Sequence, residues 1–164
     1  MSSLPSKNSP GRPTKLKLDK GFQPSPVKEG DEAYPNGIFE FNITGLLTFI
    51  DAHPGDFPIE PIPVADIPEY GSSRLDESAV LSADLSRPIL LAEIAPGRHN
   101  LIDGHHRVAK ARRDGVPIIF AWRIACPQHV PFLTSTEAYE KYVEYWNFKV
   151  KEMQKPRERS QVRR

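Results

Sequence analysis

The chain has 164 residues, is 38% hydrophobic and carries a net charge of +1, which suits one domain with a modest core. Its single cysteine cannot form an intramolecular disulfide, and no apolar run is long enough to act as a signal segment or to cross a bilayer. These features argue against a disulfide-stabilised or membrane-spanning protein, and we expect a soluble, cytoplasmic one.

The charge is unevenly distributed along the chain. Residues 1–30 carry a net charge of +4 and residues 149–164 carry +5, which leaves −8 for residues 31–148. Basic ends can contact nucleic acid or an acidic partner, but they also occur as solvated ends that keep a chain soluble. Residues 1–34 contain few large apolar side chains to offset their ordering entropy. We therefore predict a disordered basic tail (1–34), a folded domain (35–148) and a basic C-terminal tail (149–164).

The first half of the predicted domain combines a strand, two helices and a proline-rich segment. Residues 38–43 alternate in polarity, which is typical of a strand, and Thr44 is placed to cap a helix over 45–52. Residues 57–64 contain three prolines, and because proline lacks the N–H of a strand ladder, they predict an edge strand or a covering segment. A loop is expected at 66–71 and a helix at 75–85.

The second half alternates strands and helices. Strands are predicted at 88–94, 100–102 and 117–125, with a turn at 96–99 and a helix at 104–113. A capping box at 134–137 precedes a final helix, in which Tyr139, Tyr142, Val143 and Trp146 fall at helical spacing and indicate a core stripe. The pattern predicts an α+β fold, with a short mixed sheet flanked by helices and a C-terminal helix.

The stretch Asp103-Gly104-His105-His106-Arg107 lies at the predicted start of a helix. Asp103 is expected to cap this helix, whose first N–H groups have no intrahelical partner and lie at its positive end. Positive side chains are unfavourable there unless an anion is bound, so His106 and Arg107 favour a phosphate site, and Gly104 would let the anion approach closely. The alternative is that Asp103 only caps the helix while the histidines lie on the surface.

A dedicated metal site is not expected at this stretch. Adjacent histidines on a helix point about 100° apart and cannot easily ligate one ion. Mg²⁺ bound together with a nucleotide remains compatible with the sequence, because it needs only one or two carboxylates.

Four segments resemble the ParB/sulfiredoxin superfamily: IPVADI at 62–67, RPILL at 87–91, LIDGHHRVAKA at 101–111 and GVPI at 115–118. The similarity covers residues 61–125. It implies a small ParB/sulfiredoxin-like domain that binds a nucleotide such as ATP, ADP or CTP, with Gly104, His106 and Arg107 at the phosphates. His105 falls where sulfiredoxins carry their reactive cysteine, so sulfiredoxin chemistry is not expected. Too few residues follow position 125 for the DNA-binding domain of ParB proteins.

The Asp-Gly-His form is similar to the free-serine-kinase branch of the superfamily, in which this stretch binds the nucleotide and an acidic residue activates a hydroxyl. The resemblance implies Asp103 and His105 as catalytic candidates and leaves Glu60, Asp66 or Glu69 as the activating acid. We expect a nucleotide- or phosphate-binding protein that hydrolyses a nucleotide or transfers a phosphoryl group. The alternatives are a DNA-associated regulator or nuclease module that uses the basic tails, and a ligand sensor without catalysis.

Overall fold

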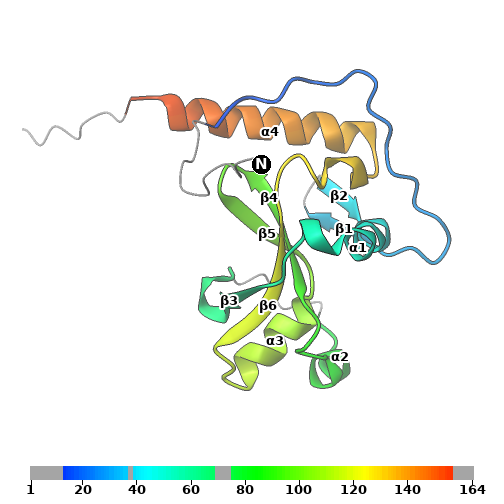
Figure 1. Cartoon of the computed structure of the whole chain (residues 1–164), viewed down its shortest axis with the longest axis vertical. Coiled ribbons are helices and arrows are strands. Elements are labelled where there is room, and N and C mark those ends of the chain that lie inside the picture. Colours follow the sequence, from blue (N-terminus) through cyan, green and yellow to red (C-terminus); the bar gives the residue numbers. More distant parts are fainter. Residues whose placement is uncertain (1–12, 37–38, 69–74, 157–164) are drawn as a thin grey trace, which may run out of the picture.

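The computed structural model describes residues 13–36, 39–68 and 75–156, which form an α+β domain (Figure 1). The described residues contain four α-helices, a sheet of two strands and a sheet of four strands. The long C-terminal helix lies across one end of the domain, and the smaller helices α2 and α3 lie at the other end (Figure 1). The α+β class predicted from the sequence is confirmed.

The larger sheet has the strand order β3-β6-β4-β5. Its strands are β3 (Glu60–Pro63), β4 (Ile89–Ala95), β5 (Arg98–Asp103) and β6 (Ile118–Ile124). Strands β4 and β5 form an antiparallel hairpin, whereas β4 and β6 are parallel and are connected through helix α3 (His105–Arg113). The proline-containing β3 pairs only with β6 and is an edge strand, as predicted.

Two hydrophobic clusters cover the two faces of this sheet. Alternate residues of β4 point to opposite faces, so Leu90 and Ala92 enter one cluster and Ile89 and Leu91 the other. The first cluster is completed by β2, by α1 (Ile43–Ala52) and by α4 (Thr136–Gln154), and the second by α3. The four residues predicted as the core stripe of the last helix are all buried in the first cluster, which confirms that prediction.

Two helices begin or end at other residues than predicted. Helix α1 is capped by Asn42, whose Oδ1 accepts from the N–H of Gly45 at 2.9 Å, whereas the Thr44 hydroxyl accepts from the N–H of Glu32. Helix α2 spans only Glu77–Ser82, because the Asp84 carboxylate accepts from the N–H and hydroxyl of Ser86 and forms a turn there. Residues 66–68 of the predicted loop at 66–71 are described, and residues 69–71 lie outside the described part.

The N-terminal segment differs from the disordered tail predicted for residues 1–34. The first part of residues 13–32 lies along α4 and the rest passes from the start of α4 towards β1, and β1 (Ala33–Asn36) pairs with β2 (Phe39–Asn42) in the smaller sheet (Figure 1). An aromatic contact contributes to this docking, because the Phe22 ring stacks on the Tyr139 ring of α4 with centroids 4.1 Å apart. Helix α4 also continues six residues into the predicted C-terminal tail, up to Gln154. Residues 1–12 and 157–164 lie outside the described part.

No helix of the described residues is both long enough and apolar enough to span a membrane.

Candidate functional site

The Asp-Gly-His-His-Arg stretch connects the end of β5 to the start of α3. Asp103 is the last residue of β5, Gly104 has a φ of +105°, and α3 begins at His105. Because the N-cap position is taken by Gly104, no side chain caps the helix, and the predicted cap by Asp103 is wrong. The Asp103 carboxylate instead accepts from Nη2 of Arg107 at 3.2 Å.

Gly104 is required for more than its positive φ. A Cβ at this position would lie 2.5 Å from Cγ2 of Ile89 and 2.9 Å from Nη2 of Arg107. Ile89 and Arg107 therefore already fill the side of Gly104 that we expected an anion to approach. The glycine lets the chain turn from β5 into α3 while the Ile89 side chain packs against its α-carbon.

The first turn of α3 leaves donor groups without acceptors. The first helical hydrogen bond runs from the N–H of Val108 to the Gly104 carbonyl at 3.0 Å. Among the described residues, the backbone N–H groups of His106 and Arg107 have no acceptor. The Arg107 residue is only 9% exposed, and its Nε has no hydrogen-bond partner there. These donors, grouped in one helical turn, are the kind that oxyanions bind.

His105 is held by the N-terminal segment. Its Nε2 lies 3.1 Å from the hydroxyl oxygen of Tyr34 on β1, and the two ring centroids are 4.9 Å apart. Burial lowers the pKa of His105, the nearby Asp103 charge raises it, and His106 lowers it again. The net lowering keeps the imidazole neutral at pH 7, so it can act as a hydrogen-bond acceptor or proton acceptor.

His106 contacts the segment that precedes α2. The backbone N–H of Asp76 donates to its Nε2 at 3.4 Å. His106 thus connects the first turn of α3 to the N-cap residue of α2. Its ring is half-buried, and its backbone N–H remains available.

Glu32 is a site residue that sequence reasoning missed. Glu32 is exposed, but partial burial of its carboxyl group raises the pKa of that group, the Asp103 charge raises it further, and Arg107 and Arg87 lower it. The structure thus brings a second carboxylate into the surroundings of Asp103 and Arg107. Glu32 fell within the predicted tail, although the Asn36-Gly37 dipeptide that follows is a known sequence signal for a β-hairpin.

Of the three acids proposed from the family resemblance, the two that the structure describes are not gathered at this site. Glu60 on β3 forms an ion pair with Arg123 at 3.9 Å. Asp66 lies in a 3₁₀ turn, and the carbonyl of the next residue, Ile67, accepts from Arg112 in the last turn of α3. Glu69 lies outside the described residues.

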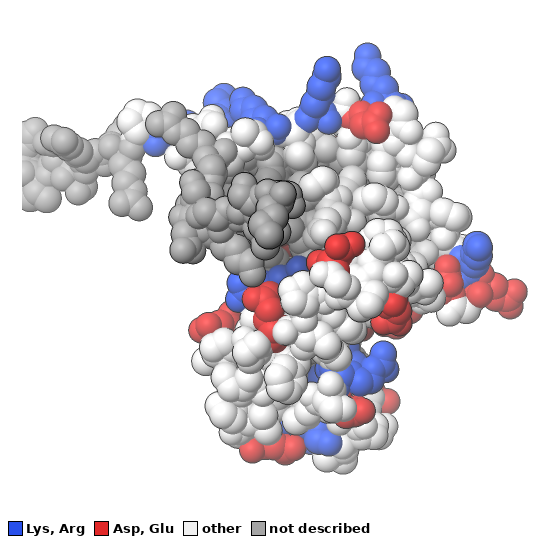
Figure 2. All heavy atoms as spheres, in the orientation of Figure 1, with Lys and Arg blue, Asp and Glu red and all other residues white. Residues whose placement is uncertain are grey.

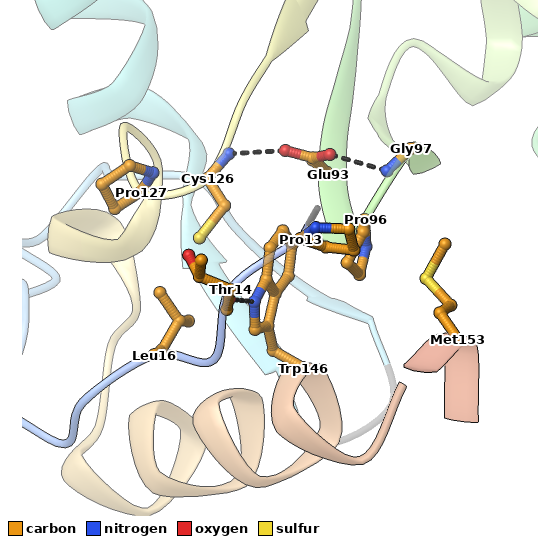
Figure 3. A pocket seen from close by; sticks show the side chains of 10 residues that line it. All are labelled: Pro13, Thr14, Leu16, Glu93, Pro96, Gly97, Cys126, Pro127, Trp146 and Met153. Carbon is orange, nitrogen blue, oxygen red and sulfur yellow. Dashed lines mark hydrogen bonds between the residues drawn. The ribbon is translucent and has the colours of Figure 1, made fainter. Parts of the chain in front are cut away.

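A separate concavity of about 670 Å³ opens between the N-terminal segment, the β4–β5 turn and α4 (Figure 3). Its walls are mostly apolar and come from Pro13, Leu16, Pro96, Pro127, Trp146 and Met153. Both Glu93 oxygens accept from backbone N–H groups, those of Gly97 and Cys126, and burial raises the pKa of the Cys126 thiol. Because the turn and Asp103 mark opposite ends of β5, the concavity is separate from the α3 site.

The charge on the molecular surface bears on the DNA alternative. On the face shown in Figure 2, Lys and Arg side chains stand out along the α4 end, and charges of both signs are mixed below it. The end segments 1–12 and 157–164, which include six of the arginines and lysines of the basic tails, are not among the described residues. Contact with DNA through the tails therefore stays a prediction.

Comparisons of the chain with protein-family models, with curated proteins and with solved structures gave no match. The resemblance to the ParB/sulfiredoxin superfamily therefore stays a prediction from the sequence. Within the described part of the chain, no three or more His, Cys, Asp or Glu side chains are grouped as a metal site would need.

Proposed function

We propose that the protein binds the phosphate groups of a nucleotide at the N-terminus of α3, and that one of these phosphates is hydrolysed or transferred there. The observation that supports this best is the state of Arg107. An arginine that is nine-tenths buried, and whose Nε has no partner among the described residues, is costly, and an oxyanion would supply the missing acceptors. The backbone N–H groups of His106 and Arg107 would bind the same anion.

The surrounding carboxylates affect which form of phosphate the site accepts. Asp103 is paired with Arg107 and Glu32 lies near both, so a free polyphosphate would meet two negative groups. Mg²⁺ fits such a site, since it is commonly held by one or two carboxylates and by the phosphates themselves. Asp103 and Glu32 would hold the ion, which would offset the phosphate charge.

The remaining roles follow from the chemistry of each group. Arg107 and His106 would orient the phosphates and stabilise the charge that develops on them during transfer. His105, a neutral imidazole, would accept a proton from the attacking hydroxyl or water, and Glu32 is a second candidate because its pKa is raised. Asp103 would act through the metal ion and through its contact with Arg107.

A thermal-shift screen tests the binding step. ATP, ADP, CTP, GTP and inorganic phosphate are added with and without Mg²⁺ to the wild type, to His106→Ala/Arg107→Ala and to Arg98→Ala. Arg98 is the matched control, because it is an exposed arginine at the other end of β5. A ligand at about 100 times its Kd adds roughly 2.7 kcal/mol of stability, which such a screen detects.

We expect a shift with a nucleotide in the wild type and in Arg98→Ala, and none in the double variant. No shift with any nucleotide would sink the proposal and favour a helix start that is only structural. Release of phosphate or transfer to an added hydroxyl compound, assayed with the nucleotide that binds, then separates an enzyme from a ligand sensor.

A further inference from the structure

The N-terminal strap is defined as residues 13–32, and its first part, residues 13–19, is hydrogen-bonded along α4. The Asn147 side-chain amide contacts the backbone of Leu16 twice, since its Oδ1 accepts from the N–H at 2.7 Å and its Nδ2 donates to the carbonyl at 3.0 Å. The Trp146 indole N–H donates to the Thr14 carbonyl at 3.0 Å. Two side chains of α4 thus make three hydrogen bonds to the strap backbone.

Towards the other end of α4, the strap is held by Tyr139. The N–H of Asp19 donates to the Tyr139 hydroxyl at 2.7 Å, and Phe22 stacks on the same ring. The N–H of Ser25 then donates to the carbonyl of Leu133, just before α4 begins. The strap is therefore attached at several successive points to α4 and to the segment that precedes it.

One buried side chain, that of Asn42, holds the last part of the strap in place. Asn42, which is 3% exposed, donates from Nδ2 to the Pro26 carbonyl at 3.1 Å and lies near Ser25 and Asp31. Its Oδ1 caps α1 at the same time. The Glu32 carbonyl accepts from the first N–H groups of α1, Ile43 and Thr44. Docking of the strap thus fixes where β1 starts.

The end of this path lies at the phosphate site. Glu32, directly before β1, lies close enough to Asp103 and Arg107 for their charges to affect its pKa, and Tyr34 on β1 contacts His105. The strap residues that dock on α4 and the residues that reach α3 are parts of one continuous segment. One contact with His105 and one charge near Asp103 therefore depend on a segment that is attached elsewhere.

We infer that the N-terminal strap is a conformational device, whose docking on α4 completes the site at α3 and whose release dismantles it. The part of this inference that concerns phosphate affinity rests on the function proposed above. The part that concerns the surroundings of His105 does not depend on that function.

The composition of the strap makes it releasable. Only two of its large side chains, Leu16 and Phe22, pack against the main cluster, whereas Leu18 and Val27 are exposed. The remaining attachment is by hydrogen bonds, and segments with few buried apolar contacts open at low free-energy cost. Pro13, Thr14 and Leu16 also line the concavity of Figure 3, so the strap is not closely packed at its start.

The variant Tyr139→Phe/Asn147→Ala tests this inference in the full chain. It removes three hydrogen bonds to the strap and keeps the aromatic stack on Phe22. We expect faster tryptic cleavage after Lys15, Lys17 and Lys20, and NMR resonances of the His105 ring that move as the ring loses its contact with Tyr34. Affinity for the nucleotide with Mg²⁺ should fall about fivefold or more, the lower end of typical coupling between sites.

Lys141→Ala is the matched control, because Lys141 lies exposed on α4 and pairs only with Glu144 among the described residues. It should leave all three measurements unchanged. If the double variant does not fold, Asn147→Ala alone should change the cleavage rate, the His105 ring and the affinity in the same direction but by less. A His105 ring that is unchanged while the strap is cleaved faster would overturn the inference. If the wild type binds no nucleotide, the proposed function fails, and the His105 measurement still decides the role of the strap.

Discussion

Arg107 reaches back across Gly104 and places its Nη2 3.2 Å from Oδ2 of Asp103, with both side chains no more than 17% exposed. This ion pair occupies one of the guanidinium donors that a phosphate would otherwise use. It also keeps the buried positive charge close to a negative one when no ligand is bound. The pair is thus both a source of stability and a competitor for the anion.

Asp103→Asn should therefore change stability and affinity in opposite directions. The free energy of unfolding should fall by about 2 kcal/mol, between the values typical of exposed and fully buried pairs. The affinity for inorganic phosphate without metal should rise, because a carboxylate that repels the anion is gone. Urea unfolding and phosphate titration by calorimetry measure the two effects. Asp51→Asn, which removes an exposed carboxylate of α1, should change neither.

Gly104→Ala should be more destabilising than Gly115→Ala. Both glycines have a positive φ, of +105° and +67°, which costs an alanine roughly 1–2 kcal/mol. A Cβ at Gly115 meets no atom within 4 Å, whereas at Gly104 it overlaps Ile89 and adds an overpacking cost of about 1–3 kcal/mol. Urea unfolding of both variants gives the difference directly, and equal losses would contradict the close packing at Gly104.

The free energy of unfolding should fall as the pH is lowered from about 6.5 to about 4, the range in which His129 stays neutral in the folded protein but not in the unfolded chain. His129 is fully buried, its Nε2–H donates to the Glu93 carbonyl at 2.6 Å, and burial lowers its pKa to about 4. The unfolded chain takes up this proton near pH 6.5, so between pH 6.5 and 4 it binds more protons than the folded one. The loss approaches about 3 kcal/mol at the acid end.

Unfolding free energies at pH 7 and pH 5 check this for the wild type and for His129→Gln, in which the side-chain amide can still donate to Glu93. The variant should lose less stability on acidification than the wild type does. His53→Gln, at an exposed position, should behave like the wild type. An equal loss in His129→Gln would show that other groups cause the pH dependence.

The Cys126 thiol should react slowly in the folded protein. Burial raises the pKa of this thiol, with the Glu93 charge adding to the effect and a hydrogen bond with Tyr142 opposing it. Because the thiolate is the reactive form, modification by a disulfide reagent at pH 7.5 should be slower than in urea and should accelerate with rising pH. The same rate in folded and unfolded protein would contradict the raised pKa of this half-buried thiol.

The sequence predicted the strands and helices that have strong periodicity or turn signals. The β4–β5 hairpin, the α3 helix after Gly104 and the aromatic stripe of α4 all follow from such local patterns. The helix starts were less predictable, because tertiary contacts decide them. These contacts determine which residue caps α1 and why no side chain caps α3. Asn42 caps α1 while it also holds the strap, and Asp103 pairs with Arg107.

The site was predicted only in its contiguous part. Gly104 to Arg107 lie in one stretch, so their spacing was informative, whereas Glu32 and Tyr34 reach the site from about 70 residues away along the chain. Their segment has the composition of a disordered tail, because the apolar surface that orders it belongs to α4. No local pattern in residues 13–34 reports a partner that lies more than a hundred residues later.

The contacts between the strap and α4 also set an order of events during synthesis. Leu16 is made 131 residues before Asn147, its hydrogen-bond partner. A nascent chain can therefore complete the β4–β5 hairpin and α3 while the strap still has no surface on which to dock. Glu32 and Tyr34 can be fixed at the candidate site only after α4 has emerged from the ribosome, so this protein would complete that site among the last steps of folding.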